Sequence, residues 1–114
     1  TKRQEDRLEQ IFRSLDADPG GETCQAMKGL VKEGEEIIGA DAPDDVRDAG
    51  LIAAAQRVEH YEIAGYGTVR TFAERLGRSD DARLLEETLS EEKDADGLLN
   101  RIAESVVNPD AAMA

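Results

Sequence analysis

The sequence predicts an all-α fold in which antiparallel helices form a bundle. Apolar residues recur every three or four positions through most of the 114 residues, which is the spacing of helices that bury one face. No segment alternates apolar and polar residues as a half-buried strand does. Glycine and proline gather at residues 16–21, 39–45 and 77–79, where they separate the periodic segments. We therefore expect one domain over residues 1–114, with three long helices and one short helix.

The first helix is expected to run from residue 1 to about residue 15. Its inward stripe follows the helical spacing and consists of Gln4, Leu8, Ile11 and Leu15. The periodicity of a helix is present from the first residues of the segment, and no capping residue precedes them. We therefore expect Thr1 to lie inside a helix that begins earlier, in a domain that is incomplete at its N-terminus.

Thr23 is expected to cap a second, shorter helix that ends near Ile38. The apolar face of this helix consists of Met27, Leu30, Val31, Ile37 and Ile38. Gly29 and Gly34 lie inside the segment, and each weakens a helix by about 1 kcal/mol relative to alanine. A helix of this kind is expected to cover one side or one end of the bundle.

The longest helix is expected between Pro43, which suits a first turn, and about Leu76. Small residues, including a run of three alanines at 53–55, keep this helix thin, so that its neighbours can approach closely. Its inward stripe, counted in steps of three and four, is Ile52, Ala55, Glu59, Glu62, Tyr66, Val69, Ala73 and Leu76.

The last helix follows after a tight connection. Gly77 is expected to end the preceding helix, and Ser79 to cap the last one, which runs to about Val106. Its inward stripe is Leu85, Thr88, Glu92, Ala95, Leu99, Ile102 and Val106. Asn108 and Pro109 are expected to end the helix and to leave the last residues loose.

Three carboxylates, Glu59, Glu62 and Glu92, interrupt the two long stripes. A buried carboxylate without a partner is unfavourable by several kcal/mol, so something positive is expected opposite them. The short connection makes the last two helices antiparallel neighbours. Glu62 lies 15 residues before Gly77 and Glu92 lies 15 residues after it. At about 1.5 Å per residue, both carboxylates therefore reach the same height in the hairpin.

The spacing leaves two interpretations of these carboxylates open. As hard oxygen ligands they suit iron, manganese, magnesium or calcium, and a histidine nitrogen would favour iron, manganese or zinc. Alternatively, they form a network of ion pairs with Arg57, Arg70 or Arg101.

Three neighbouring residues could extend the site. His60 lies one position off the stripe and is a ligand, a partner of a ligand, or an ordinary surface histidine. Asp96 follows Glu92 by four residues and either adds a ligand or is a solvated aspartate. Tyr66 follows Glu59 by seven residues and either shields the site or is a core aromatic residue.

The composition argues against some classes of function. Asp and Glu number 26 against 14 Lys and Arg, a net charge of -12, so no nucleic-acid partner is expected. No apolar run approaches the roughly 20 residues of a membrane span, so no membrane partner is expected either. Cys24 is the only cysteine, which leaves no intramolecular disulfide and no cysteine-based zinc site, and fits a cytoplasmic protein.

Four parts of the chain carry a resemblance to a known family: Arg7–Phe12, Cys24–Leu30, Leu51–Thr68 and the pairs Leu84-Leu85, Glu91-Glu92 and Ala95-Asp96. The most specific is the central one, LIAAAQRVEHYEIAGYGT. These segments are similar to the YciF/YciE-like stress proteins. The resemblance covers nearly the whole chain.

The resemblance implies a ferritin-like, rubrerythrin-like antiparallel four-helix bundle that lacks its first helix, a bacterial stress-related role, and assembly into a homodimer or higher oligomer. It also implies a di-metal carboxylate site that holds iron or manganese and reacts with oxygen or peroxide. The candidate ligands are Glu59, Glu62, Glu92, Asp96 and His60. The alternative is a non-catalytic helical stress protein whose carboxylates are structural, so whether the protein is an enzyme stays open.

The sequence departs from the family in two ways. Family members carry a further long helix, and a His-x-x-Glu pattern, before the position of Thr1. The usual Glu-x-x-His of ferritin-like helices would place a histidine at position 95, where this chain has Ala95. We therefore expect either that Asp96 substitutes for that histidine or that the site is rich in oxygen ligands.

Overall fold

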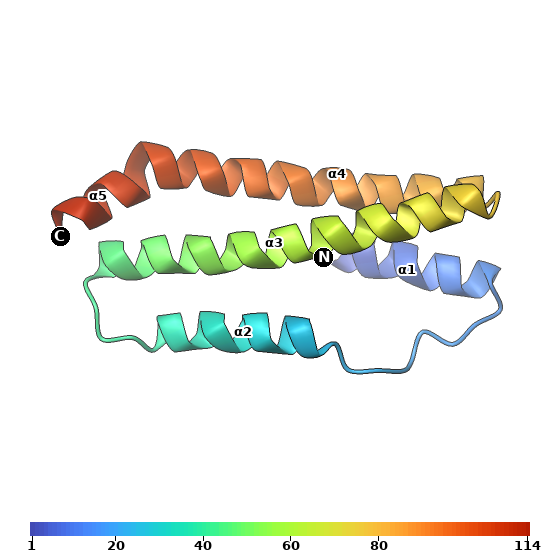
Figure 1. Ribbon diagram of the computed structural model, residues 1–114, viewed down its shortest axis with the longest axis horizontal. Helices are drawn as coiled ribbons and strands as arrows, with labels where there is room; N and C mark the ends of the chain where they lie inside the picture. The colour runs from blue at the N-terminus through green and yellow to red at the C-terminus, as the bar shows by residue number, and fades with distance from the viewer.

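The computed structural model describes residues 1–114 and consists of helices joined by loops (Figure 1). The helices are α1 (Lys2–Ser14), α2 (Gln25–Ile38), α3 (Asp44–Arg75) and α4 (Ser79–Ile102), followed by a π-helical turn, η1 (Ala103–Val107), and by α5 (Asn108–Met113). No strand is present, and the predicted all-α fold is confirmed.

The antiparallel hairpin of α3 and α4 forms the long axis of the molecule, whose extents are 53 × 27 × 21 Å (Figure 1). α2 packs along α3, whereas α1 contacts α4. α3 and α4 contain 32 and 24 residues, and α1 and α2 contain 13 and 14. The helices thus divide into two long and two short ones, rather than the three and one expected.

Two helix starts lie one residue away from the predicted cap. α2 is capped by Cys24 and not by Thr23, because Cys24 has the extended backbone of a cap and its Sγ accepts a hydrogen bond from the Met27 N–H at 3.4 Å. Arg78, and not Ser79, occupies the cap position of α4. Gly77 ends the preceding helix as predicted, with a φ of 73° that glycine adopts without strain.

The prediction that Asn108 and Pro109 end the last helix is wrong. α4 passes through the π-helical turn into α5, which continues to Met113. Pro109 lies in the first turn of α5, where the missing backbone N–H of proline removes no hydrogen bond that the helix requires. A proline at the start of a helix is therefore compatible with the continued helical path.

The apolar core is small and lies within the hairpin and the turn that follows it. Its fully buried members are Ala54, Ala73, Ala82, Leu84, Leu85, Leu89 and Ala103. α1 contributes no fully buried residue, and only Leu8 and Ile11 pack against the edge of this core. Polar contacts between α1 and α4 therefore contribute much of the interaction that fixes the position of α1.

Several large apolar side chains stay exposed near the end of α3. Val69 is 49% exposed, Phe72 61% and Leu76 75%. Contiguous exposed apolar surface is typical of interaction sites on proteins. None of the helices combines the length with the apolar character that a membrane crossing requires.

Candidate metal centre

Glu59 and Glu62 of α3 meet Glu92 of α4 midway along the hairpin. One carboxylate oxygen from each residue lies within 4.8 Å of the other two. Glu59 and Glu62 are one turn apart on α3, and the tight connection fixes the register that brings Glu92 to their level. Glu92 is only 4% exposed, whereas the other two are half-buried. The structure thus brings together the three carboxylates whose meeting the hairpin register predicts.

No positively charged side chain pairs with these three carboxylates. Arg57 contacts Glu33 at 3.7 Å, Arg70 pairs with Glu86 and Glu74, and Arg101 forms no ion pair. The alternative of an ion-pair network with these arginines is therefore wrong. The site remains a cluster of acidic groups that is not paired with any cationic side chain.

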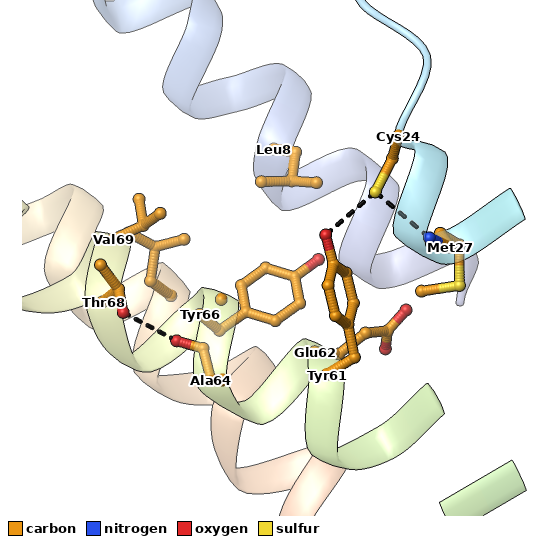
Figure 2. Close-up of a pocket in the computed structure, with 11 residues that line it drawn as sticks. Leu8, Cys24, Met27, Tyr61, Glu62, Ala64, Tyr66, Thr68 and Val69 are labelled. Carbon is orange, nitrogen blue, oxygen red and sulfur yellow. Dashed lines mark hydrogen bonds between the residues drawn. The ribbon is translucent and has the colours of Figure 1, made fainter. Parts of the chain in front are cut away.

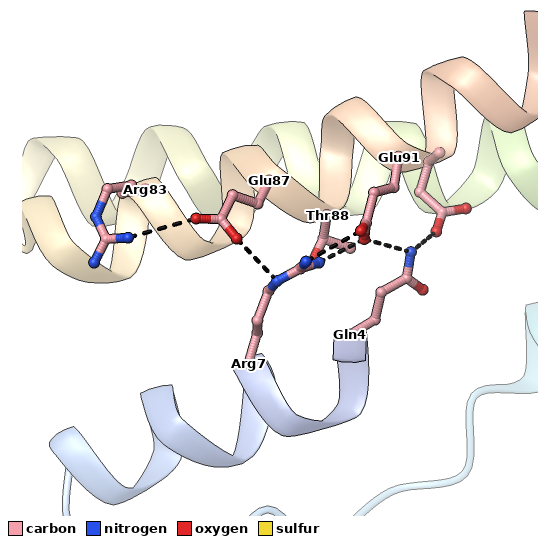
Figure 3. A network of polar contacts seen from close by, with 7 residues as sticks. Gln4, Arg7, Arg83, Glu87, Thr88 and Glu91 are labelled. Carbon is pink, nitrogen blue, oxygen red and sulfur yellow. Dashed lines mark hydrogen bonds and ion pairs between the residues drawn. The ribbon is translucent and has the colours of Figure 1, made fainter. Parts of the chain in front are cut away.

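Gln4 of α1 is the one neutral side chain that hydrogen-bonds to the cluster. Its amide Nε2 donates to Glu92 Oε1. The same atom also donates, at 3.3 Å, to Glu91 Oε1 (Figure 3). The Oε2 atom of Glu59, in contrast, is buried and has no hydrogen-bond partner. A buried carboxylate oxygen without a donor is unfavourable unless it holds a proton or faces a cation.

The three carboxylates strongly alter one another's protonation. Burial, together with the nearby Glu92, raises the pKa of Glu59 to about 8 and that of Glu62 to about 7. Burial acts on Glu92 in the same direction, but hydrogen bonds from Glu59, Glu62 and Gln4 outweigh it and lower the pKa of Glu92. Without a metal, Glu92 therefore carries negative charge near neutral pH, whereas Glu59 mostly holds its proton and Glu62 titrates in this range.

Asp96 and His60 form a separate pair beside the cluster. Asp96 Oδ1 lies 3.2 Å from His60 Nε2 and accepts a hydrogen bond from Gln56 Nε2 at 3.3 Å. The charge of Asp96 contributes to the raised pKa of Glu59, and Asp96 follows Glu92 by one helical turn on α4. The His60 side chain is 67% exposed, so the structure places this residue at the surface as a partner of Asp96.

Tyr66 lines a cavity next to Glu62. The cavity has a volume of about 640 Å³, opens to solvent, and is lined mainly by apolar residues, with Glu62, Tyr61 and Cys24 at its wall (Figure 2). Burial, and then the charges of Glu62 and Glu92, raise the pKa of Tyr66. Tyr66 thus packs against the core and also lies near the carboxylates, so it combines a feature of each interpretation.

Two features of the site were not anticipated from the sequence. One is the pairing of Cys24 Sγ with Tyr61 Oη at 3.0 Å, which joins α2 to α3. The other is the approach of Gln4 to Glu92. The sequence contains a signal for the contact between Gln4 and Glu92, because Gln4 is a polar residue at the start of the apolar stripe of its helix. No spacing rule, however, connects α1 with a position on α4.

The fold and the site together define a class of protein: a helical bundle that directs glutamates from facing helices into one polar centre. The sequence pattern of the family described as "Domain of unknown function (DUF892)" matches residues 1–112. The chain belongs to this family.

Comparison with individual proteins agrees with this assignment. The chain is 54% identical over 88 residues to Protein YciF of Escherichia coli (strain K12), an alignment that covers 77% of this chain and 53% of that protein. The chain therefore spans about half the length of the curated relative that it matches. The resemblance to YciF-like stress proteins is confirmed.

Solved structures show the same helical arrangement. The E. coli stress protein YciF superposes with a TM-score of 0.87 at 48% identity, over 92% of this chain and 67% of that chain. YcfI from Rhodopseudomonas palustris, provisionally described as a structural protein, superposes with a TM-score of 0.82 at 47% identity, over 87% of this chain and 63% of that chain.

Proposed function

We propose that this stress-protein relative binds iron or manganese through Glu59, Glu62 and Glu92. The observation that carries the proposal is the meeting of three carboxylates within 4.8 Å, with no cationic side chain paired to any of them. A protein normally avoids this arrangement, because like charges at such distances raise the free energy of the folded state. A bound cation would remove that penalty and would give the orphan oxygen of Glu59 a partner.

The donor set suits a hard divalent cation. Carboxylate oxygens are the ligands that iron(II), manganese(II), magnesium and calcium share, and glutamates on facing bundle helices are typical of iron and manganese sites. Three carboxylates provide for one cation. A di-metal centre would need further donors, and Asp96 and His60 are the nearest titratable pair along the hairpin. Iron or manganese held in this way supplies a metal that reacts with oxygen or peroxide.

The residues of this chain would hold and shield such a metal. Glu92, the most buried of the three carboxylates, supplies the charge that is present at neutral pH, and Glu59 and Glu62 supply further charge when they lose their protons. Tyr66 and the apolar wall of the neighbouring cavity present few polar groups to the metal from that side.

We expect protein that is produced with iron and manganese in the medium, and purified without chelator, to retain metal. The double variant Glu59→Ala, Glu92→Ala should retain less than a tenth of the wild-type content, because two of three ligands are lost. Elemental analysis by mass spectrometry measures the ratio of metal to chain.

The matched control is Glu35→Ala, Glu36→Ala, which removes two exposed carboxylates of α2 that form no ion pair. Its metal content should equal that of the wild type. Equal metal in the two double variants would show that the metal binds elsewhere on the acidic surface, and the proposal would fail.

A non-catalytic, structural role is the second candidate, and one observation favours it. With protons on Glu59 and Glu62, and with Gln4 donating to Glu92, the cluster is largely satisfied without a cation. Wild-type protein that contains no metal, and that does not bind added Mn²⁺ or Fe²⁺, would support this role in place of the first.

We further propose that the protein associates with a second copy of itself through the exposed apolar side chains at the end of α3, Val69, Phe72 and Leu76. Sedimentation, read against the intact mass, should give a particle of at least twice the 12.4 kDa chain. Phe72→Glu should shift the particle toward the monomer, whereas Ile38→Glu, at an exposed apolar position of α2, should not. A compact wild-type monomer would contradict this proposal.

A further inference from the structure

We infer that Gln4 is a positioning residue for the proposed metal centre, which holds the carboxylate of Glu92 in place through its amide. The inference rests on the proposed function. It adds a contribution from α1, a helix that supplies none of the three carboxylates.

The contact is directed at the most buried member of the cluster. Gln4 Nε2 donates to Oε1 of Glu92, and no protein N–H donates to the other oxygen, Oε2. A carboxylate fixed through one oxygen keeps its second oxygen available for a cation. Hydrogen-bond donors of this kind orient the ligands of metal sites, and their loss typically weakens metal binding by about 10–100-fold.

Gln4 is itself held by a network of ion pairs. Its amide also bonds Glu91, and Glu91 accepts from the guanidinium of Arg7, which contacts Glu87 at 3.2 Å and Thr88 at 3.1 Å (Figure 3). The Arg7 side chain is only 15% exposed, and its guanidinium pairs with Glu91. The ion pair holds the Glu91 carboxylate in place, and Glu91 in turn anchors the amide.

Two adjacent glutamates of α4, Glu91 and Glu92, face different helices. Glu91 faces α1 and forms part of the ion-pair network, whereas Glu92 lies with Glu59 and Glu62 of α3. Gln4 is the side chain that contacts both. Because α1 buries no residue fully, this polar contact sets the position of the amide more than apolar packing does.

The test compares Gln4→Met, which keeps the length of the side chain but removes both N–H donors, with two control variants. Gln10→Met makes the same exchange at an exposed position of α1. Ser14→Ala loosens α1 at its other end, where Ser14 contacts Asp81 and Arg78. Free Mn²⁺ is measured by electron paramagnetic resonance during titration, and the visible spectrum of bound Co²⁺ reports ligand geometry. Thermal unfolding without metal is recorded for each variant.

Gln4→Met is expected to weaken Mn²⁺ binding by roughly 10–100-fold and to change the Co²⁺ spectrum at saturation. Ser14→Ala should lower the unfolding midpoint but leave both metal readouts at wild-type values, and Gln10→Met should change none of the three. If Gln4→Met does not fold, Gln4→Asn tests the same contact, because its amide is one methylene too short to reach Glu92.

Wild-type Mn²⁺ affinity in Gln4→Met, with an unchanged Co²⁺ spectrum, would overturn the role of Gln4 and leave the metal site standing. Equal loss of affinity in Gln4→Met and Ser14→Ala would also overturn it, since Gln4 would then act only by holding α1 in place. A wild-type protein that binds no Mn²⁺ would instead refute the proposed function itself.

Discussion

Glu92→Gln is expected to abolish tight metal binding and, at the same time, to destabilise the metal-free protein. Loss of a direct ligand should weaken Mn²⁺ binding by more than the roughly 10–100-fold that follows from losing a ligand's hydrogen-bond partner. Glutamine keeps the shape of the side chain, but its amide has one acceptor oxygen in place of two and carries no charge. Stability should fall because the hydrogen bonds that lower the pKa of Glu92 make its charge stabilising near neutral pH.

The loss should appear as a fall of several degrees in the unfolding midpoint, which corresponds to about 1 kcal/mol for a domain of this size. Calorimetry of the metal-free variants measures it, and Mn²⁺ titration measures the loss of binding. Glu86→Gln is the control, since it removes an equal charge from the exposed face of α4, where a surface ion pair contributes about 0–1 kcal/mol. A Glu92→Gln protein that still binds Mn²⁺ as the wild type does would contradict the assignment of Glu92 as a ligand, and one as stable as the wild type would contradict the stabilising role of its charge.

Metal affinity is expected to increase steeply with pH between about pH 6 and pH 8. The pKa values of about 8 for Glu59 and about 7 for Glu62 mean that both carboxyls hold protons at the lower end of this range. A cation must displace those protons, so the affinity should rise by roughly 10–100-fold per pH unit while one or two protons are released. Titration calorimetry in two buffers with different ionisation enthalpies counts the released protons.

The stability of the metal-free protein should change with pH in the opposite direction. A carboxyl whose pKa is raised by folding contributes stability that is complete below its ordinary pKa of 4.5 and is lost as the pH rises through the folded values, about 7 and about 8. The unfolding midpoint should therefore fall between about pH 5 and pH 8, and saturating Mn²⁺ should remove most of that fall. Affinity and stability that are both independent of pH over this range would show that the carboxyls titrate normally.

The sequence predicts the α3–α4 part of the site because one short connection determines the geometry there. With Gly77 as the turn, counting residues outward is enough to place Glu62 and Glu92 at one level. The apolar periodicity then turns both toward the same interface. The identity of the three carboxylates and the all-α fold could therefore be predicted from local rules alone.

The contribution of α1 could not be predicted in the same way. Ten residues, 15–24, separate α1 from α2, and a loop of that length leaves the position of α1 relative to α4 undetermined. The contacts of Gln4 and Arg7 with α4 span more than 80 residues of sequence and depend on tertiary packing. The error at Pro109 has a different cause. A proline in the interior of a helix breaks it, whereas a proline in the first turn is tolerated.

The residues that line the cavity beside Glu62 include every tyrosine of the chain. The chain contains no tryptophan and only two tyrosines, and both Tyr61 and Tyr66 line that cavity. All tyrosine fluorescence therefore originates within one short stretch of α3 next to the carboxylates. The protein thus carries an intrinsic fluorophore at the site of interest, and a paramagnetic ion bound there can quench its emission without any added label.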